Sequence, residues 1–180
     1  LQHPTGELCG SVFWTLLNHR LHRTFPRNVT YVDEIETSLL NVAFANQGRG
    51  DVQGIRYFAN LHYAKQIPTN HGTCCEGSGT RIFGLAPSFI YSLGPKALYI
   101  DLFFASSLHT TLPDTSSSLS LTLQSNFPYS PNVSISIFSA SQTSFDLHIR
   151  IPTWASSPMD IQVDHKKVGT GNPGTYFTLS

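Results

Sequence analysis

Charged side chains are scarce in this chain. Only 12% of its 180 residues are Asp, Glu, Lys or Arg, and the formal net charge is zero. This is about half the usual share of charged residues. Lys and Arg form no stripe or cluster, so a nucleic acid or another polyanion is not expected as a partner. The chain also lacks a run of about 20 apolar residues, so no membrane-spanning helix is expected.

Cysteine is scarce too, but the positions of the three cysteines are informative. Three cysteines cannot all pair within one chain, which favours thiols or metal ligands over a disulfide framework. Cys9 lies two residues after Glu7, and Cys74 and Cys75 are adjacent. Three thiolates and one carboxylate form a ligand set that suits Zn²⁺. The pattern therefore predicts a metal centre made by these four residues.

Local geometry limits how Glu7 and Cys9 can share one ion. On a regular helix, residues i and i+2 point roughly 200° apart. The two side chains converge only if Glu7 lies on the extended entry to the helix that contains Cys9. Two other interpretations stay open, namely Cys9 as a small buried hydrophobic residue and a Cys9–Cys74 disulfide.

The first half of the chain has the apolar spacing of helices. We expect helices over residues 7–25, 32–47 and 82–93, ended respectively by a Phe-Pro pair, a Gly-rich triplet and a Gly-Pro pair. Residues 55–61 are aromatic and favour a short extended segment between the helices. The adjacent cysteines are expected to lie just before the third helix.

After residue 94 the apolar period changes to two. Apolar and polar residues alternate over segments 98–104, 119–123, 133–138, 147–151 and 161–163. Short alternating strands separated by Ser, Pro, Asn and Gly are typical of an antiparallel β-sandwich. The polar stretch Ser106–Ser118 is expected to be a loop. Helices first and strands second predict an α+β fold, with a domain boundary between residues 94 and 95.

Several motifs of this chain resemble those of glycoside hydrolase family 127, a family of β-L-arabinofuranosidases. The resemblance covers nearly the whole chain, and its most specific parts are the adjacent cysteines with their glycines and the Arg-Ile-Pro-x-Trp-Ala motif. The segments that carry it are Glu7–Ser11, Gly54–Phe58, Gly72–Arg81, Pro87–Ser92, Ala97–Phe103 and Leu147–Ala155.

The resemblance implies a fold and a mechanism. Residues 1–94 would be the C-terminal part of an (α/α)₆ barrel, and residues 95–180 a β-sandwich. Glu7, Cys9, Cys74 and Cys75 would bind Zn²⁺. Cys74 would be the nucleophile of a retaining glycosidase that acts on a β-L-arabinofuranoside or a related furanoside, with sulfur in place of the usual carboxylate.

One part of the family's machinery is not found in this sequence. The family's general acid/base is a glutamate upstream of the Glu-x-Cys segment, and only six residues precede Glu7 here. We therefore expect this chain to be a fragment that is weak or inactive alone.

Three further residues are candidates for binding substrate. They are His71, Glu76 and Tyr57, although a loop histidine without a role, a helix-capping glutamate and a core tyrosine are the structural alternatives. The functional alternative for the whole chain is a non-catalytic module that binds glycan or a partner, with a purely structural cysteine or zinc site.

Overall fold

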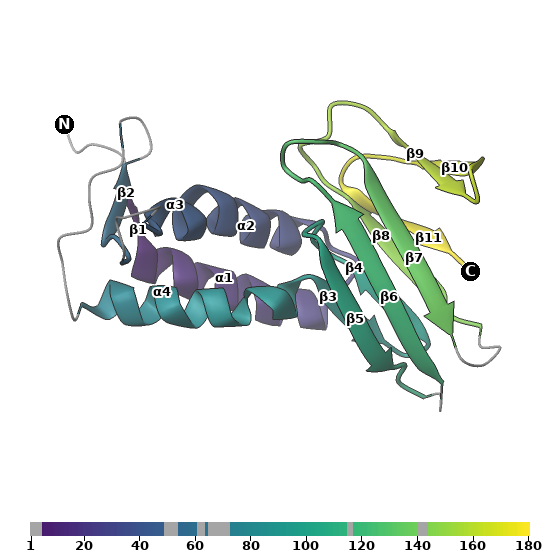
Figure 1. Ribbon diagram of the computed structural model, residues 1–180, viewed down its shortest axis with the longest axis horizontal. Coiled ribbons are helices and arrows are strands. Elements are labelled where there is room, and N and C mark those ends of the chain that lie inside the picture. Colours follow the sequence, from purple (N-terminus) through teal and green to yellow (C-terminus); the bar gives the residue numbers. More distant parts are fainter. Residues whose placement is uncertain (1–4, 49–53, 61–63, 65–72, 115–116, 140–143) are drawn as a thin grey trace. The chain divides into compact units, whose positions relative to one another are not determined.

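The computed structural model describes residues 5–48, 54–60, 64, 73–114, 117–139 and 144–180 (Figure 1). The chain forms two compact units. Residues 1–25 and 30–88 make up the first, called the helical unit here. Residues 26–29 and 89–180 make up the second, called the strand unit.

The first predicted helix is confirmed as α1 (Leu8–Thr24). Its buried side chains include Leu8, Val12 and Thr15, which recur at helical spacing on the face toward the other helices. The helix ends before Pro26, whose ring disfavours helical backbone in the preceding residue. α1 contacts both of the other long helices of the unit, so it is the element around which the helical unit packs.

The second predicted helix is also confirmed, but it is not uniform. It consists of α2 (Thr30–Ser38), a π-helical turn η1 (Leu39–Ala43) and the short α3 (Phe44–Asn46). Val32, Ile35 and Leu39 are almost fully buried, as their spacing of three and four residues predicts.

The third helix lies earlier in the chain than predicted. α4 spans Cys74–Leu85 and is followed by a 3₁₀ turn η2 (Ala86–Phe89) and a strand β3 (Tyr91–Gly94). A capping box starts α4: the Glu76 N–H donates to Thr73 Oγ1 at 3.4 Å, and the Thr73 N–H donates to Glu76 Oε2 at 2.9 Å. α4 ends just before Pro87, which has no N–H to continue the helical ladder. The adjacent cysteines therefore lie in the first turn of α4 rather than before it.

A small antiparallel ribbon lies at the start of α1. β1 (Thr5–Glu7) pairs with β2 (Phe58–Asn60), which confirms part of the predicted extended segment. The Leu8 N–H also donates to the Tyr57 carbonyl at 3.2 Å. These bonds fix Tyr57 beside the first residues of α1. Within the helical unit, α1 and α4 run in the same direction and begin at the same end (Figure 1).

The strand unit contains three sheets. A four-stranded sheet has the order β11-β8-β4-β3, a three-stranded sheet the order β5-β6-β7, and β9 and β10 form a hairpin. The strands not yet bounded are β4 (Ala97–Ile100), β5 (Ser106–Thr111), β6 (Ser118–Ser125), β7 (Val133–Ser139), β8 (Asp146–Ile151), β9 (Met159–Val163), β10 (Lys166–Gly171) and β11 (Thr175–Leu179).

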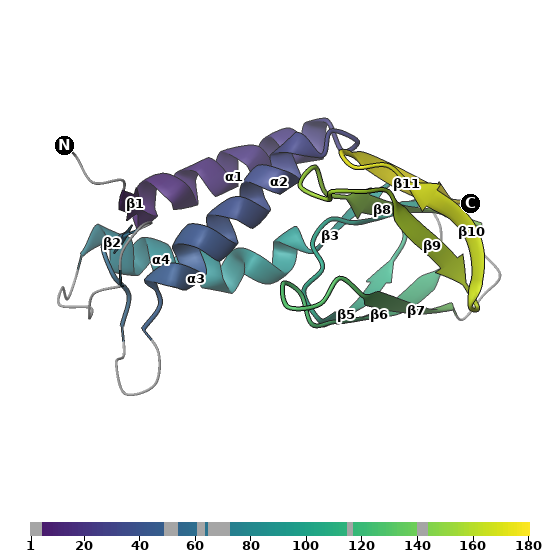
Figure 2. The same cartoon turned by 90° about the horizontal axis from the view of Figure 1, so that it is seen from above.

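One apolar core lies between the two larger sheets, which face each other in Figure 2. Alternate leucines of β6 point into it, as the period of two predicts. All four residues of β4 are buried, which shows that both faces of this strand are covered. The core residues are Leu98, Ile100, Phe103, Leu112, Leu119, Leu121, Leu123, Leu147 and Ile149.

The structure confirms the α+β class and corrects two predictions about the strands. Ser106–Ser118 is not simply a loop, because β5 pairs with β6 over its whole length. Leu108, between Ser and Thr residues, provides the apolar side of this short strand. The strands are also not all antiparallel, since β4 pairs with β8 in parallel. The long connection through β5, β6 and β7 permits that pairing.

No helix in the described part of the chain is long and apolar enough to cross a membrane.

Candidate metal centre

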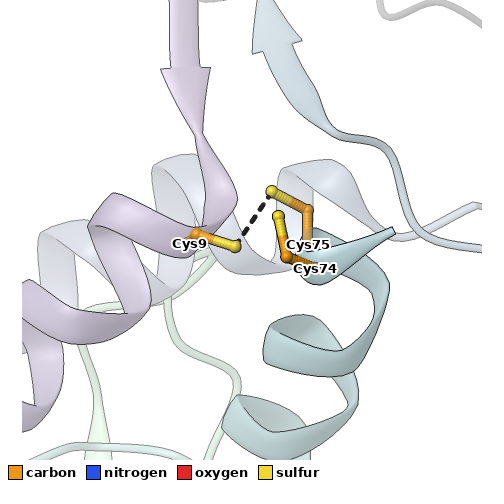
Figure 3. Close-up of side chains that lie close together, drawn as sticks. All are labelled: Cys9, Cys74 and Cys75. Carbon is orange, nitrogen blue, oxygen red and sulfur yellow. Dashed lines mark hydrogen bonds between the residues drawn. The ribbon is translucent and has the colours of Figure 1, made fainter. Parts of the chain in front are cut away.

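The three cysteines meet at the end of the helical unit where α1 and α4 begin (Figure 3). Cys9 lies in the first turn of α1, and Cys74 and Cys75 in the first turn of α4. Their three sulfur atoms all lie within 4.8 Å of one another. The Cys75 thiol donates a hydrogen bond to the Cys9 sulfur at 3.2 Å. All three are free cysteines, so the alternative of a Cys9–Cys74 disulfide is not realised.

The three sulfurs differ in their access to solvent. Cys75 is fully buried and Cys9 is 9% exposed, whereas Cys74 is exposed. A molecule that approaches from solvent therefore meets the Cys74 sulfur first.

Burial and hydrogen bonds set the thiol pKa values in opposite directions. Burial raises the pKa of Cys9, but hydrogen bonds with Ser78, Cys75 and Cys74 outweigh it and hold the pKa below its ordinary value. Burial, together with the bond to Cys9, raises the pKa of Cys75 to about 12. Without a metal ion, the Cys75 proton is thus retained and shared with a Cys9 sulfur that ionises more readily.

Glu7 is placed differently from the sulfurs. It is the last residue of β1 and the N-cap of α1, with extended backbone (φ −71°, ψ 128°). This is the conformation that convergence with Cys9 requires. Its side chain is exposed. Among the described residues, the group of possible ligand atoms within 4.8 Å of one another comprises the three sulfurs without the Glu7 carboxylate. The carboxylate is still close enough for its charge to raise the pKa of Cys9 and of Tyr57.

Two of the three candidate substrate residues are in the described part of the chain. The Tyr57 hydroxyl lies 4.0 Å from the Cys74 sulfur. The hydrogen bond with Cys74 is the main cause that raises the pKa of Tyr57. The Glu76 carboxylate accepts the Thr73 N–H in the capping box, as the structural alternative for this residue predicted. His71 lies outside the described residues.

Two neighbours of the site were not singled out from the sequence. Ser78 Oγ lies 3.3 Å from the Cys9 sulfur, one helical turn after Cys75. Gly79 provides the space for the helices to meet, because a Cβ there would lie 2.7 Å from Ile55 Cδ1 and 2.9 Å from Leu8 Cδ2. Cys75, Ser78 and Gly79 share the buried face of α4. Their spacing of three and four residues from Cys75 is the sequence signal that could have identified them.

The donor set suits a metal ion that prefers sulfur. Three thiol sulfurs from two helices lie close enough together to contact one ion, and the exposed Cys74 leaves a side of the group open to solvent. Soft thiolates select metals such as zinc over Mg²⁺ or Ca²⁺.

Comparisons with known proteins agree with the sequence motifs. The family model described as beta-L-arabinofuranosidase, GH127 middle domain, matches residues 97–180. No curated protein matches the chain.

Solved structures share the fold over nearly all of the chain. A structure titled glycoside hydrolase has a TM-score of 0.81 and 23% identity, and the match covers 96% of this chain and 30% of that one. A GH127 beta-L-arabinofuranosidase from Geobacillus stearothermophilus T6 has a TM-score of 0.80 and 19% identity, with 98% of this chain and 30% of that one covered. A third structure, titled as a GH127 beta-arabinofuranosidase, has a TM-score of 0.80 and 18% identity, with 96% and 30% covered.

This chain thus spans less than a third of the length of these solved structures. The match of the family model to residues 97–180 and the shared fold together confirm the resemblance of this chain to glycoside hydrolase family 127.

Proposed function

We propose that this chain is part of a zinc-dependent retaining glycosidase that acts on a β-L-arabinofuranoside or a related furanoside. The family resemblance supports a glycosidase and a carbohydrate substrate. The observation that carries the rest is the convergence of Cys9, Cys74 and Cys75 from two helices that are far apart in the sequence.

The sulfur positions are compatible with zinc. A Zn–S bond of about 2.3 Å in a tetrahedral site separates two sulfurs by about 3.8 Å. Here the Cys75 and Cys9 sulfurs are 3.2 Å apart, and every pair of the three sulfurs lies within 4.8 Å. Glu7 would supply the fourth ligand after its exposed side chain rotates toward the sulfurs. A bound zinc ion would keep the sulfurs ionised at neutral pH.

Cys74 is the residue best placed to act as the nucleophile. It is the exposed member of the group, and the thiolate is the reactive form of cysteine. In the first step the Cys74 sulfur bonds to the anomeric carbon while the bond to the leaving oxygen breaks, which gives a thioglycosyl intermediate. In the second step water attacks the same carbon and the thiolate leaves, so the anomeric configuration is retained.

Tyr57 and His71 are proposed to contact the sugar. Tyr57 is held near Cys74 by backbone bonds to the start of α1, so it would stay in place during the reaction. Glu76 was proposed for the same role, but its use in the capping box makes it a weaker candidate. We propose that a general acid/base has to come from outside this chain, which would then be weak or inactive alone.

At the level of the whole protein, we propose that residues 1–94 belong to an (α/α)₆ barrel and residues 95–180 to a β-sandwich. Exposed apolar side chains on α1 agree with this, since further barrel helices would cover them. Phe13, Trp14 and Leu17 are 60%, 47% and 47% exposed.

Zinc content and a trapped intermediate test the proposal. Purified chain should contain about one zinc ion, and Cys75→Ser should lose it, whereas Ser88→Ala, an exposed position on η2, should retain it. A dinitrophenyl β-L-arabinofuranoside has a leaving group that needs no protonation, so it should glycosylate Cys74 without an acid catalyst. Mass spectrometry should find one pentosyl group on the Cys74 peptide.

The non-catalytic module is the alternative that these measurements separate. It predicts no pentosyl group on Cys74, and a glycan affinity that a chelator leaves unchanged. If the pentosyl adduct forms to the same extent in the Cys74→Ser variant, Cys74 is not the nucleophile.

A further inference from the structure

A buried hydroxyl contacts the cysteine group from the side of α4. Ser78 is 8% exposed, and its Oγ atom lies 3.3 Å from the Cys9 sulfur. The two residues are 69 positions apart in the sequence and belong to different helices, α4 and α1. A buried polar group is costly without a hydrogen-bond partner, so the sulfur is what makes a serine tolerable at this point of the helix contact.

The partner of Ser78 differs from the usual partner of a hydroxyl inside a helix. Such side chains commonly donate to the carbonyl oxygen four residues earlier. Thr80, two residues later on the same helix, does so at 2.9 Å to Glu76. In the described part of the chain, the side-chain hydrogen bond of Ser78 is instead with Cys9 of the other helix. The hydroxyl is therefore directed at the sulfur group rather than used within α4.

The hydrogen bonds connect three side chains in series. The Cys75 thiol donates to the Cys9 sulfur at 3.2 Å, and the Cys9 thiol donates to Ser78 Oγ. A hydroxyl can both donate and accept, whereas an ionised sulfur can only accept. When a metal ion replaces the proton of Cys9, the Ser78 hydroxyl can rotate and donate to the same sulfur. One contact thus suits both the free thiol and the metal-bound sulfur.

We infer that Ser78 is a positioning residue of the metal centre, a role that rests on the proposed function. Its hydroxyl fixes the Cys9 sulfur and donates a hydrogen bond to it in the metal-bound chain. Partners that hydrogen-bond to ligating side chains orient them and tune the metal. Cys9 is then the ligand held in place, while the exposed Cys74 remains accessible to substrate.

Binding of Co²⁺ to the purified chain tests this role, because charge transfer from sulfur to cobalt gives an absorption band that reports on the sulfur ligands. Ser78→Ala should weaken Co²⁺ binding about tenfold or more, as loss of such a partner typically does. It should also move the band to longer wavelength, since a sulfur without a hydrogen-bond donor releases its electrons more easily. Ser78→Thr, which keeps the hydroxyl, should restore the band position and most of the affinity.

Thr80 provides the matched control. It carries a hydroxyl on the same helix, but it is exposed and its hydrogen bond stays within α4. Thr80→Ala should leave the Co²⁺ affinity within about twofold, because surface substitutions away from special contacts have small effects. The band should not move in this variant.

A role in packing alone predicts weaker binding with an unchanged band position, or equal losses in Ser78→Ala and Ser78→Thr, and either result would overturn the inference. Unchanged affinity and band position in Ser78→Ala would overturn it as well, while a wild-type chain that still binds Co²⁺ would leave the proposed zinc chemistry intact. A wild-type chain that binds neither Co²⁺ nor Zn²⁺ would refute the proposed function itself, and the role of Ser78 with it.

Discussion

Replacement of Gly79 by alanine tests whether close helix packing assembles the cysteine group. An added Cβ would lie 2.7 Å and 2.9 Å from two atoms of Ile55 and 2.9 Å from Leu8 Cδ2. Leu8 is fully buried, so it has little space to move away. α4 would therefore have to shift away from α1, and Cys75 lies on the same face of α4, one turn earlier.

Two opposing effects set the magnitude. Overpacking of a well-packed site typically costs about 1–3 kcal/mol. Alanine gains about 1 kcal/mol over glycine in a helix interior. With three contacts below 3.0 Å on two side chains, the overpacking cost should fall in the upper half of its range. The expected net loss of stability is about 1–2 kcal/mol.

Gly77 provides a matched control on the same helix. A Cβ at Gly77 would meet nothing within 4 Å, so Gly77→Ala should raise stability by about 0.5–1 kcal/mol. Urea unfolding followed by far-UV circular dichroism measures both changes, and metal titration measures the effect on the sulfurs. Gly79→Ala should also weaken metal binding, while Gly77→Ala should not. If Gly79→Ala is as stabilising as Gly77→Ala, the described contact between α1 and α4 is wrong.

Three other predictions concern separate parts of the chain. Thr73→Ala should destabilise the helical unit by about 1 kcal/mol in urea unfolding, because it removes the N-cap of α4, and Thr73→Ser should restore most of the loss. Burial, followed by the charge of Arg27, lowers the pKa of His148 below its ordinary value of 6.5. Because the folded strand unit favours the neutral ring, its stability should fall as the pH drops below about 6.5. His148→Gln should make the stability less dependent on pH. Lys167→Ala should change stability by less than about 1 kcal/mol, since the 2.7 Å ion pair with Asp160 joins two side chains that are each 55% exposed; a larger loss would show that this pair contributes more than an ordinary surface contact.

The elements whose identity depends on periodicity were predictable from the sequence. The helical spacing of Cys9, Val12, Leu16 and Leu21 gave α1 nearly to its end residues. The buried face differs in part from that pattern, because the polar Thr15 is buried whereas the apolar Phe13 and Leu17 are exposed. The alternation of leucines gave β6 and its buried face. In both cases one side of the element packs on the core, so the residue pattern records the structure directly.

The sequence predicts the structure less well where a local signal competes with a stronger apolar pattern, or where the decisive contact is distant in the chain. Thr73 and Glu76 have the spacing of a capping box, which marks the start of α4. The apolar run from Ile82 to Leu93 was stronger and shifted the predicted helix toward the C-terminus. The parallel pairing of β4 with β8 joins segments almost 50 residues apart. No short-range pattern specifies such a pairing, because it is selected by the burial of both faces in the assembled core.

The cysteine group combines both situations. Residue types alone identified Cys9, Cys74 and Cys75, because adjacent thiols with a third thiol and a carboxylate elsewhere are a recognisable ligand set. Their meeting depends on helix direction. α1 and α4 begin at the same end of the helical unit. Cys9 in the first turn of α1 therefore lies close to Cys74 and Cys75 in the first turn of α4, although at least 65 positions separate them in the sequence.

The close packing at Gly79 fixes the separation of the two helices, and the bond from Leu8 to Tyr57 fixes the ribbon beside them. These contacts are made by the chain itself. The position of the three sulfurs thus depends on the packing of α1 against α4 and on backbone hydrogen bonds, so substitutions at these contacts should alter the sulfur group even though they replace none of its members.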